Sequence, residues 1–304
     1  MKSALAVLVL TALTAGCVSM HNRETNDYGN ITDRLAKLRG DGPRKRVLLL
    51  PFVNDSLEKD PAVARTGRDA LVSGLRLTDN FIILDNKDVP KDLKQYYKDG
   101  AYDMDEVAKV ATEMGVMAVI EGRVLEIKAH KEGDAVGLIR TLKAHVQATV
   151  AVRVISAANG REILNDTRSA NSESSTHHIA GEQVDLASDP ELIRESLVSA
   201  FEGMILPIVK SVDKITWNGR IALVNGDRIY LNAGRLTGIN IGDILRVSED
   251  GEDVYDPNTG ALIGKAPGRM KGTLEVVSYF GKDGCVTVVH SGSGFKENDK
   301  VELY

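Results

Sequence analysis

The sequence predicts an α+β protein in which a mixed sheet covered by helices (residues 45–215) is followed by a small all-β barrel domain (216–304). Three observations support this. A continuous apolar run, "VLLLPFV", begins at Val47 and is followed by segments of helical period. Residues 141–155 alternate strictly between apolar and polar side chains. From residue 218 onward, short alternating segments are separated by glycine turns. The 304 residues are enough for two domains.

The first domain is expected to begin with a buried strand and a helix. The run from Val47 has no polar alternation, which is typical of a strand buried on both faces. Asp60 followed by Pro61 is an N-cap and first-turn pair, and apolar residues recur at helical spacing from there to Thr78. "FIILD" (81–85) is then expected as a second strand.

The next elements are predicted from the same kinds of signal, namely helix caps, apolar runs and turn residues. Asp103 and Glu106 open a helix over 104–114 that Gly115 ends, and 116–127 is a third strand. The alternating segment 141–155 and "REILNDTRSAN" form a hairpin around Asn159-Gly160. Ser188 and Glu191 are expected to open a long amphipathic helix that ends near residue 212.

The C-terminal segment predicts the barrel. Strands flank Asn225-Gly226, and the stretches "GRLTGINIGDIL" and "HSGSGFKENDKV" form a weak internal repeat. Residues 248–268 are expected as an elaborated hairpin. Its "DPNTG" (256–260) is turn chemistry and lacks the alternating carboxylates of a calcium loop.

The N-terminus predicts export and lipid anchoring. Lys2 precedes the apolar run Ala4–Leu13, which is too short to span a bilayer. The small residues before Cys17 resemble a bacterial lipoprotein signal, with Thr14 at the position where that pattern prefers leucine. We therefore expect residues 1–16 to be a signal peptide, Cys17 to be acylated, and residues 17–44 to form a flexible tether. Val18 follows the cysteine where enteric lipoproteins retained in the inner membrane have aspartate, so by analogy we expect the periplasmic face of the outer membrane.

Composition and cysteine content exclude some partners. The net charge of -5 gives no support to nucleic-acid binding, which normally requires a basic face. With Cys17 acylated, Cys285 is the remaining thiol, and its position in "GCVTVVHSG" indicates a small buried strand residue.

No catalytic set, cofactor motif or metal site is predicted. The chain has no G-x-S-x-G elbow, phosphate loop or H-E-x-x-H motif. His177-His178 lie in a serine-rich segment near Glu173 and Glu182 and are expected in a solvated loop. The isolated histidines are His21, His130, His145 and His290. Asp55 and Asp85 sit at strand ends, where either an active site or a turn cap would place a carboxylate. We expect a non-enzyme.

Two resemblances cover most of the chain beyond Cys17. Residues 45–214 resemble the CsgG family of periplasmic lipoprotein domains through "RVLLLPFVND", "GVMAVIEGRVLEI" and "VAVRVISAANGREIL". The last 85 or so residues resemble the C-terminal domain of the FlgT family of flagellar H-ring assembly proteins through "GRIALVNGDRIYLNAGRLTGINIGDILRV" and "GTLEVVSYFGKDGCVTVV". The resemblances imply a non-catalytic scaffold in a homo-oligomeric ring, with flagellar or other envelope proteins as partners.

Two alternatives stay open beside flagellar assembly, and the first is a curli-type secretion channel or export accessory. CsgG-type pores insert two hairpins per subunit into the membrane, but the matching segments here, "KAHKEGDAVGLIRTLKAH" and "DTRSANSESSTHHIAGEQV", are charged or polar. A charge on a lipid-facing strand costs about 2–4 kcal/mol at the bilayer midplane, which disfavours a secretion channel. The other alternative is a lipoprotein that activates a cell-wall synthase.

Overall fold

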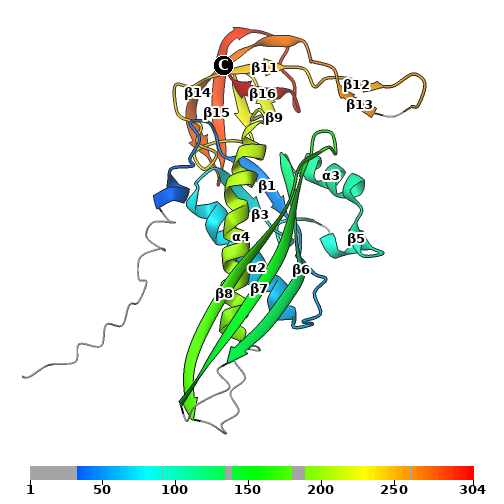
Figure 1. Ribbon diagram of the computed structural model, residues 1–304. Coiled ribbons are helices and arrows are strands. Elements are labelled where there is room, and N and C mark those ends of the chain that lie inside the picture. The colour runs from blue at the N-terminus through cyan, green and yellow to red at the C-terminus, as the bar shows by residue number, and fades with distance from the viewer. Residues whose placement is uncertain (1–32, 91, 134–138, 180–188, 261) are drawn as a thin grey trace, which may run out of the picture.

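The computed structural model describes residues 33–90, 92–133, 139–179, 189–260 and 262–304. Its α+β content, with a mixed sheet and a closed barrel, confirms the predicted fold class. Figure 1 shows the barrel above one end of the long sheet, with helix α4 leading from one to the other. Among the described helices, none combines the length and the apolar character that crossing a membrane requires.

The main sheet has the strand order β3-β1-β6-β7-β8, with the short β2 also paired to β6. The strands β1, β3 and β6 run parallel, and β6, β7 and β8 form an antiparallel ribbon. The bounds are Lys45–Leu49 for β1, Val53–Asn54 for β2, Phe81–Leu84 for β3, Ala118–Gly133 for β6, Ile139–Ser156 for β7 and Glu162–Ile179 for β8.

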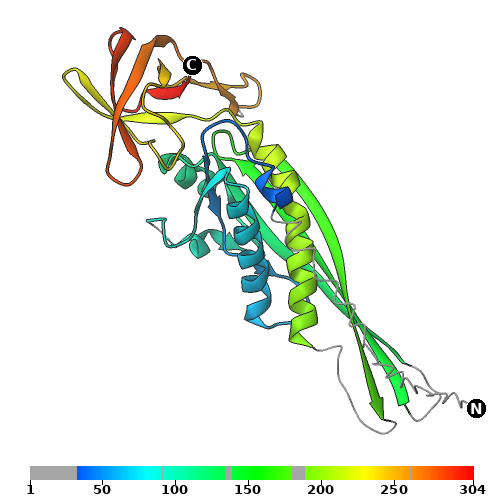
Figure 2. The same ribbon diagram turned by 90° about the vertical axis from the view of Figure 1, so that its left-hand side faces the viewer.

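Helices α2 (Pro61–Leu77) and α4 (Pro190–Asp213) lie side by side on one face of this sheet (Figure 2). The predicted cap of α2 is confirmed, since Asp60 accepts a hydrogen bond from the N–H of Ala62 at 2.8 Å. Phe201 is fully buried between the helices and the sheet, and its ring lies 5.2 Å from that of Phe52. Gly67 gives this ring its space, because a Cβ there would lie 2.3 Å from Phe201.

Within the described residues, the opposite face of the sheet is covered at one end. Helix α3 (Met104–Glu113), the 3-10 turn Leu93–Tyr96 and the small hairpin of β4 (Tyr97–Lys98) and β5 (Ala101–Tyr102) pack there. Leu48 and Leu50 point to this cluster, while Val47 and Leu49 point to the α2–α4 core. The prediction that this strand is buried on both faces is therefore confirmed.

The alternation predicted over 141–155 is confirmed in β7. The apolar side chains on one face of this strand are fully buried and face α4: Ala144, Val146, Ala148, Val150, Val152 and Val154. The helix is tied to this strand by Ser196, whose hydroxyl donates to the carbonyl of Val146 at 2.8 Å.

Four sequence-based expectations need correction. The third strand does not end at 127 but runs to Gly133, and β8 runs to Ile179, because ladder pairing between neighbouring strands continues through the polar segments. His177-His178 accordingly lie in a strand and not in a loop. The N-cap of α4 is Asp189, which accepts from the N–H of Glu191 at 2.9 Å.

The fourth correction concerns the tether. Residues 33–44 belong to the folded domain, since Leu35 is buried in the main core. The carbonyl of Leu38 also accepts a hydrogen bond from the Asn80 amide at 2.7 Å. The remaining tether residues 17–32 lie outside the described part of the chain.

The second unit is a closed antiparallel barrel with the strand order β10-β15-β14-β11-β16-β9. The bounds are Gly219–Asn225 for β9, Arg228–Leu231 for β10, Ile244–Ser248 for β11, Met270–Phe280 for β14, Gly284–Gly292 for β15 and Lys300–Leu303 for β16. Strands β12 (Asp253–Tyr255) and β13 (Leu262–Lys265) form a separate two-stranded arm between β11 and β14.

The weak internal repeat corresponds to a repeated turn of the barrel. In the first copy, the N–H of Asn240 donates to the Asp243 carboxylate at 2.7 Å. In the second, the N–H of Lys296 donates to the Asp299 carboxylate at the same distance. Each turn leads into one of two neighbouring strands, β11 and β16, so the repeat marks equivalent corners of the barrel.

Candidate functional site

The two units meet at a junction held by polar bonds. The Arg46 guanidinium donates to the carbonyl of Asn232 at 2.5 Å and lies 3.3 Å from the Asp283 carboxylate. Asp283 also accepts from the hydroxyl of Thr237 at 2.6 Å and from the N–H groups of Gly234 and Thr237, both at 3.0 Å. The junction thus fixes the barrel against β1 of the sheet domain.

Apolar side chains complete the junction. Met117, from the segment before β6, and Trp217, after α4, are both buried in the core of the barrel. The barrel core is therefore closed in part by residues of the sheet domain and of the connection. This arrangement places the barrel and its arm in a defined direction relative to the long sheet.

A groove lies beside this junction, between the start of β1, the end of α4 and the last strand. It encloses about 510 Å³, within the range of pockets that bind small ligands or side chains. Its apolar lining includes Leu38, Phe81, Val209 and Trp217. Basic side chains at its edge include Arg39, Lys45 and Lys210. Of these, Arg39 pairs with Asp79 and Lys45 with Asp213.

The arm formed by β12 and β13 carries exposed apolar side chains. Val254 is 42% exposed, Tyr255 55% and Ile263 60%. The turn at its tip is the predicted one, since the Asp256 carboxylate accepts from the N–H groups of Asn258 and Thr259, both at 2.8 Å. These bonds, that to Thr259 first, lower the pKa of Asp256. The carboxylate therefore acts as the cap of a turn.

The carboxylates at strand ends are held by neighbouring groups. Asp85 accepts from the N–H of Lys87 at 2.8 Å and pairs with Arg68 at 3.1 Å. Asp55 pairs with Arg123 at 3.0 Å. The structure supports the turn role for Asp85, whereas Asp55 takes part in an ion pair, which the sequence did not predict.

A buried carboxylate that the sequence did not single out lies next to Asp55. The Glu121 side chain is only 2% exposed and is held by Arg123 at 2.9 Å and by Arg153 at 2.7 Å. Burial, and then the charge of Glu121, raises the pKa of Tyr102 above its usual range. The sequence places Glu121 and Arg123 two residues apart on one strand, but the contact with Arg153 depends on the register between β6 and β7.

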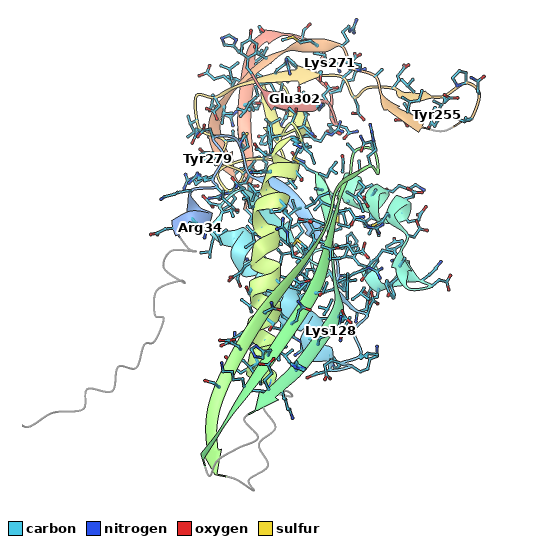
Figure 3. All side chains as sticks on the ribbon, in the orientation of Figure 1. Arg34, Lys128, Tyr255, Lys271, Tyr279 and Glu302 are labelled. Carbon is cyan, nitrogen blue, oxygen red and sulfur yellow. The ribbon has the colours of Figure 1, made fainter. Side chains whose placement is uncertain are left out.

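The outer face of the β6–β8 ribbon brings together histidines that are isolated in the sequence. His130 pairs in register with His145, which pairs with Glu173 on β8. The His145 ring lies 3.4 Å from Glu173 and 4.0 Å from Glu132. Lys128, labelled in Figure 3, lines the same shallow groove as His130 and His145. In the described residues, no group of three or more His, Cys, Asp or Glu side chains is arranged to hold a metal ion.

The other predicted sites are placed as follows. Cys17, the expected lipidation site, lies outside the described residues, as do His21 and Glu182. Cys285 is fully buried in β15, as predicted, and burial raises its pKa to about 12. The thiol is therefore protonated at neutral pH. His290 is exposed, and its ring lies 3.1 Å from the hydroxyl of Thr273.

No protein-family model and no curated protein match the chain. Among solved structures, it is similar to the hypothetical protein CT253 from Chlamydia trachomatis, with a TM-score of 0.37 and 14% identity over 56% of this chain and 98% of that one. Lipoprotein GNA1162 from Neisseria meningitidis gives a TM-score of 0.30 and 15% identity over 54% and 99%.

A further similarity is to the C-terminal domain of LpoB from Salmonella enterica. Its TM-score is 0.28, with 12% identity over 47% of this chain and 98% of that domain. At these values, the similarities carry no functional argument.

Proposed function

We propose that this protein is an outer-membrane lipoprotein that acts as a non-catalytic scaffold of an envelope machine, and that this machine is the flagellar basal body. Acylated Cys17 would anchor the chain, and the described domains would face the periplasm. The proposal rests on the lipoprotein-like N-terminus and on the resemblances to CsgG-type and FlgT-type domains.

The observation that carries the scaffold role is the polar junction between the two units. Arg46, Asp283 and Thr237 hold the barrel in one direction on the sheet domain. A scaffold requires such a fixed arrangement, because the spacing of its partners depends on it. The carboxylates Asp55, Asp85 and Glu121 are engaged in turns and ion pairs, which favours structural roles for them.

The ribbon weighs against the secretion-channel alternative. The apolar face of β7 is covered by α4, where Ala144 and Val146 pack against Leu192. The opposite face of the ribbon carries Lys128 and Glu132 of β6, both more than half exposed. A strand in lipid needs an apolar side chain at every second position facing outward. Conductance of the purified protein in planar bilayers would support the channel against this argument.

Electron cryotomography of the flagellar motor in wild-type and deletion cells tests the leading proposal. We expect the deletion to remove a ring density near the outer membrane. An unaltered motor together with normal motility would overturn the flagellar role. A Cys17→Ser variant should leave the membrane fraction while keeping the fold, and its continued membrane attachment would contradict lipid anchoring.

Binding of a peptidoglycan synthase would instead favour the activator alternative. Native mass spectrometry of the same purified chain distinguishes the two roles. A ring scaffold should form a defined homo-oligomer, whereas a monomer bound to a synthase would move the assignment to cell-wall regulation.

A further inference from the structure

The β12–β13 arm leaves apolar side chains without cover. Its strands pair with each other in a separate two-stranded sheet. Tyr255 and Ile263 are each more than half exposed. A projecting hairpin with exposed aromatic and branched side chains is a recurrent form of interaction surface.

The groove beside the junction offers a complementary apolar surface. Leu206 on α4 is 41% exposed and Leu303 on β16 is 39% exposed, and both line the groove together with buried Val209 and Trp217. Its volume of about 510 Å³ is of the size that binds a few side chains. The groove can thus receive the tip of a hairpin without rearrangement of the core.

The charges of the two surfaces are opposite. Residues 249–269, which contain the arm, have five carboxylates and two basic side chains. Exposed on the arm are Glu252 and Asp253. The groove is lined by the basic side chains Arg39, Lys45 and Lys210 and by one carboxylate, Asp213. Lys45 pairs with Asp213 and Arg39 with Asp79, and Lys210 is exposed at the edge. Opposite charges at the rim of an interface set its register and speed association.

Arm and groove lie on opposite sides of the molecule. In Figure 3, Tyr255 marks the arm on one side, and Arg34, which precedes the groove-lining residue Leu38 in the chain, lies on the other. Figure 2 confirms the separation, since the segment after Asp33 faces the viewer while the arm is directed away. The arm of one chain is therefore placed to reach the groove of another chain and not its own.

We propose that the β12–β13 arm of one copy docks in the groove between Leu38, Leu206 and Leu303 of the next copy. Tyr255 and Ile263 occupy the apolar lining, and Asp253 faces Lys210. The contact joins two different surfaces of the same chain, so it is a head-to-tail interface. This inference rests on the proposed scaffold function and names the contact through which the scaffold assembles.

Site-specific photo-crosslinking of the full chain tests the contact. A benzophenone amino acid replaces Tyr255, and the protein is irradiated after purification in detergent. We expect a covalent dimer whose adduct maps by mass spectrometry to residues 38–45 or 206–217. The matched control carries the same amino acid at Leu57, which is 94% exposed outside both surfaces, and should give no specific dimer.

A charge exchange provides the second measurement. Asp253→Lys and Lys210→Glu should each lower the dimer yield severalfold, and the two changes together should restore it. Adducts that map to another face of the chain or to another protein would overturn the proposal. A double variant whose dimer yield is as low as that of the single variants would also overturn the proposal.

Crosslinking and tomography of the motor test the arm–groove contact and the flagellar role separately. If deletion removes the ring density but Tyr255 gives no self-adduct, the scaffold role stands and the arm–groove contact is wrong. If the self-adduct forms and the motor is unaltered, the contact stands and the flagellar role is wrong.

Discussion

The two ribbons of this protein differ in how their apolar side chains are covered. The β6–β8 ribbon turns its apolar face to helix α4, where Val146 packs against Leu192. None of the described helices covers the β12–β13 arm, and Val254, Tyr255 and Ile263 are exposed. A hairpin alone is marginally stable in water, so a ribbon requires packing against another element. The first ribbon finds this support within the chain, and in our proposal the arm finds it in a second copy.

The largest effect is expected from removing the side chain that holds α4 over the sheet. Phe201→Ala should lower the free energy of unfolding by about 3–5 kcal/mol, because it leaves a cavity in the fully packed core. Phe280→Ala is a matched control, since this ring is 42% exposed on the barrel. Chemical denaturation of both variants measures the difference. Equal losses would contradict the assignment of α4 as the cover of the ribbon.

A direct comparison of the two ribbons uses one aliphatic residue of each. Leu192→Ala should cost about 2–3 kcal/mol, at the lower end for buried leucine because the residue lies in the first turn of its helix. Ile263→Ala on the arm should change the stability of the monomer by less than about 0.5 kcal/mol. Urea unfolding at a protein concentration that keeps the chain monomeric tests both. A large loss for Ile263→Ala would show that the arm is packed within its own chain.

A smaller effect is expected at the hydrogen bond that ties α4 to β7. Ser196→Ala removes the donor to the Val146 carbonyl and should cost about 0.5–1.5 kcal/mol. Ser196→Cys, which keeps a weak donor, serves as the control for the space that the hydroxyl occupies. Hydrogen exchange in β7 should increase more than exchange in the barrel. An equal increase of hydrogen exchange in β7 and in the barrel would contradict a local role of the Ser196 hydrogen bond.

The smallest effect is a local pH dependence in the arm. The pKa of Asp256 is lowered by the N–H groups of Thr259 and Asn258, so this carboxylate supports the turn at pH values above its ordinary pKa near 3.8. The support is lost as the pH falls through the lowered value. Amide NMR signals of the tip should shift below pH 4, and Asp256→Asn should remove the shift. Signals that titrate equally in the variant would contradict the cap.

Much of the fold could be predicted because its signals are local. The alternation around Val146 has the period of a half-buried strand, and the Asp60-Pro61 pair combines a cap with a first helical residue. The ends of β6 and β8 could not be predicted. Their residues are mostly polar, with no apolar alternation, and the strands persist because each backbone is paired with its neighbour.

The candidate surfaces were less accessible to prediction. The groove is assembled from residues near Leu38, Leu206 and Leu303, which are far apart in the sequence. The row of His130, His145 and Glu173 depends on the register of three strands, which no single segment specifies. Turn chemistry did identify the tip of the arm, since Asp256 and Gly260 are local signals. The residues of the tip do not indicate which surface the arm binds.

The junction at Asp283 has a geometrical consequence for any assembly of several copies. Asp283 accepts three hydrogen bonds from Gly234 and Thr237 within the barrel and one from Arg46 of β1, and the Arg46 bond helps to set the angle between the arm and the groove of one chain. In a head-to-tail series, that angle is repeated at every step as a constant rotation between neighbours. The curvature, and with it the number of copies at which a circle closes, is then encoded in the monomer. A single change at this carboxylate would alter the diameter of the circle before it altered any contact between copies.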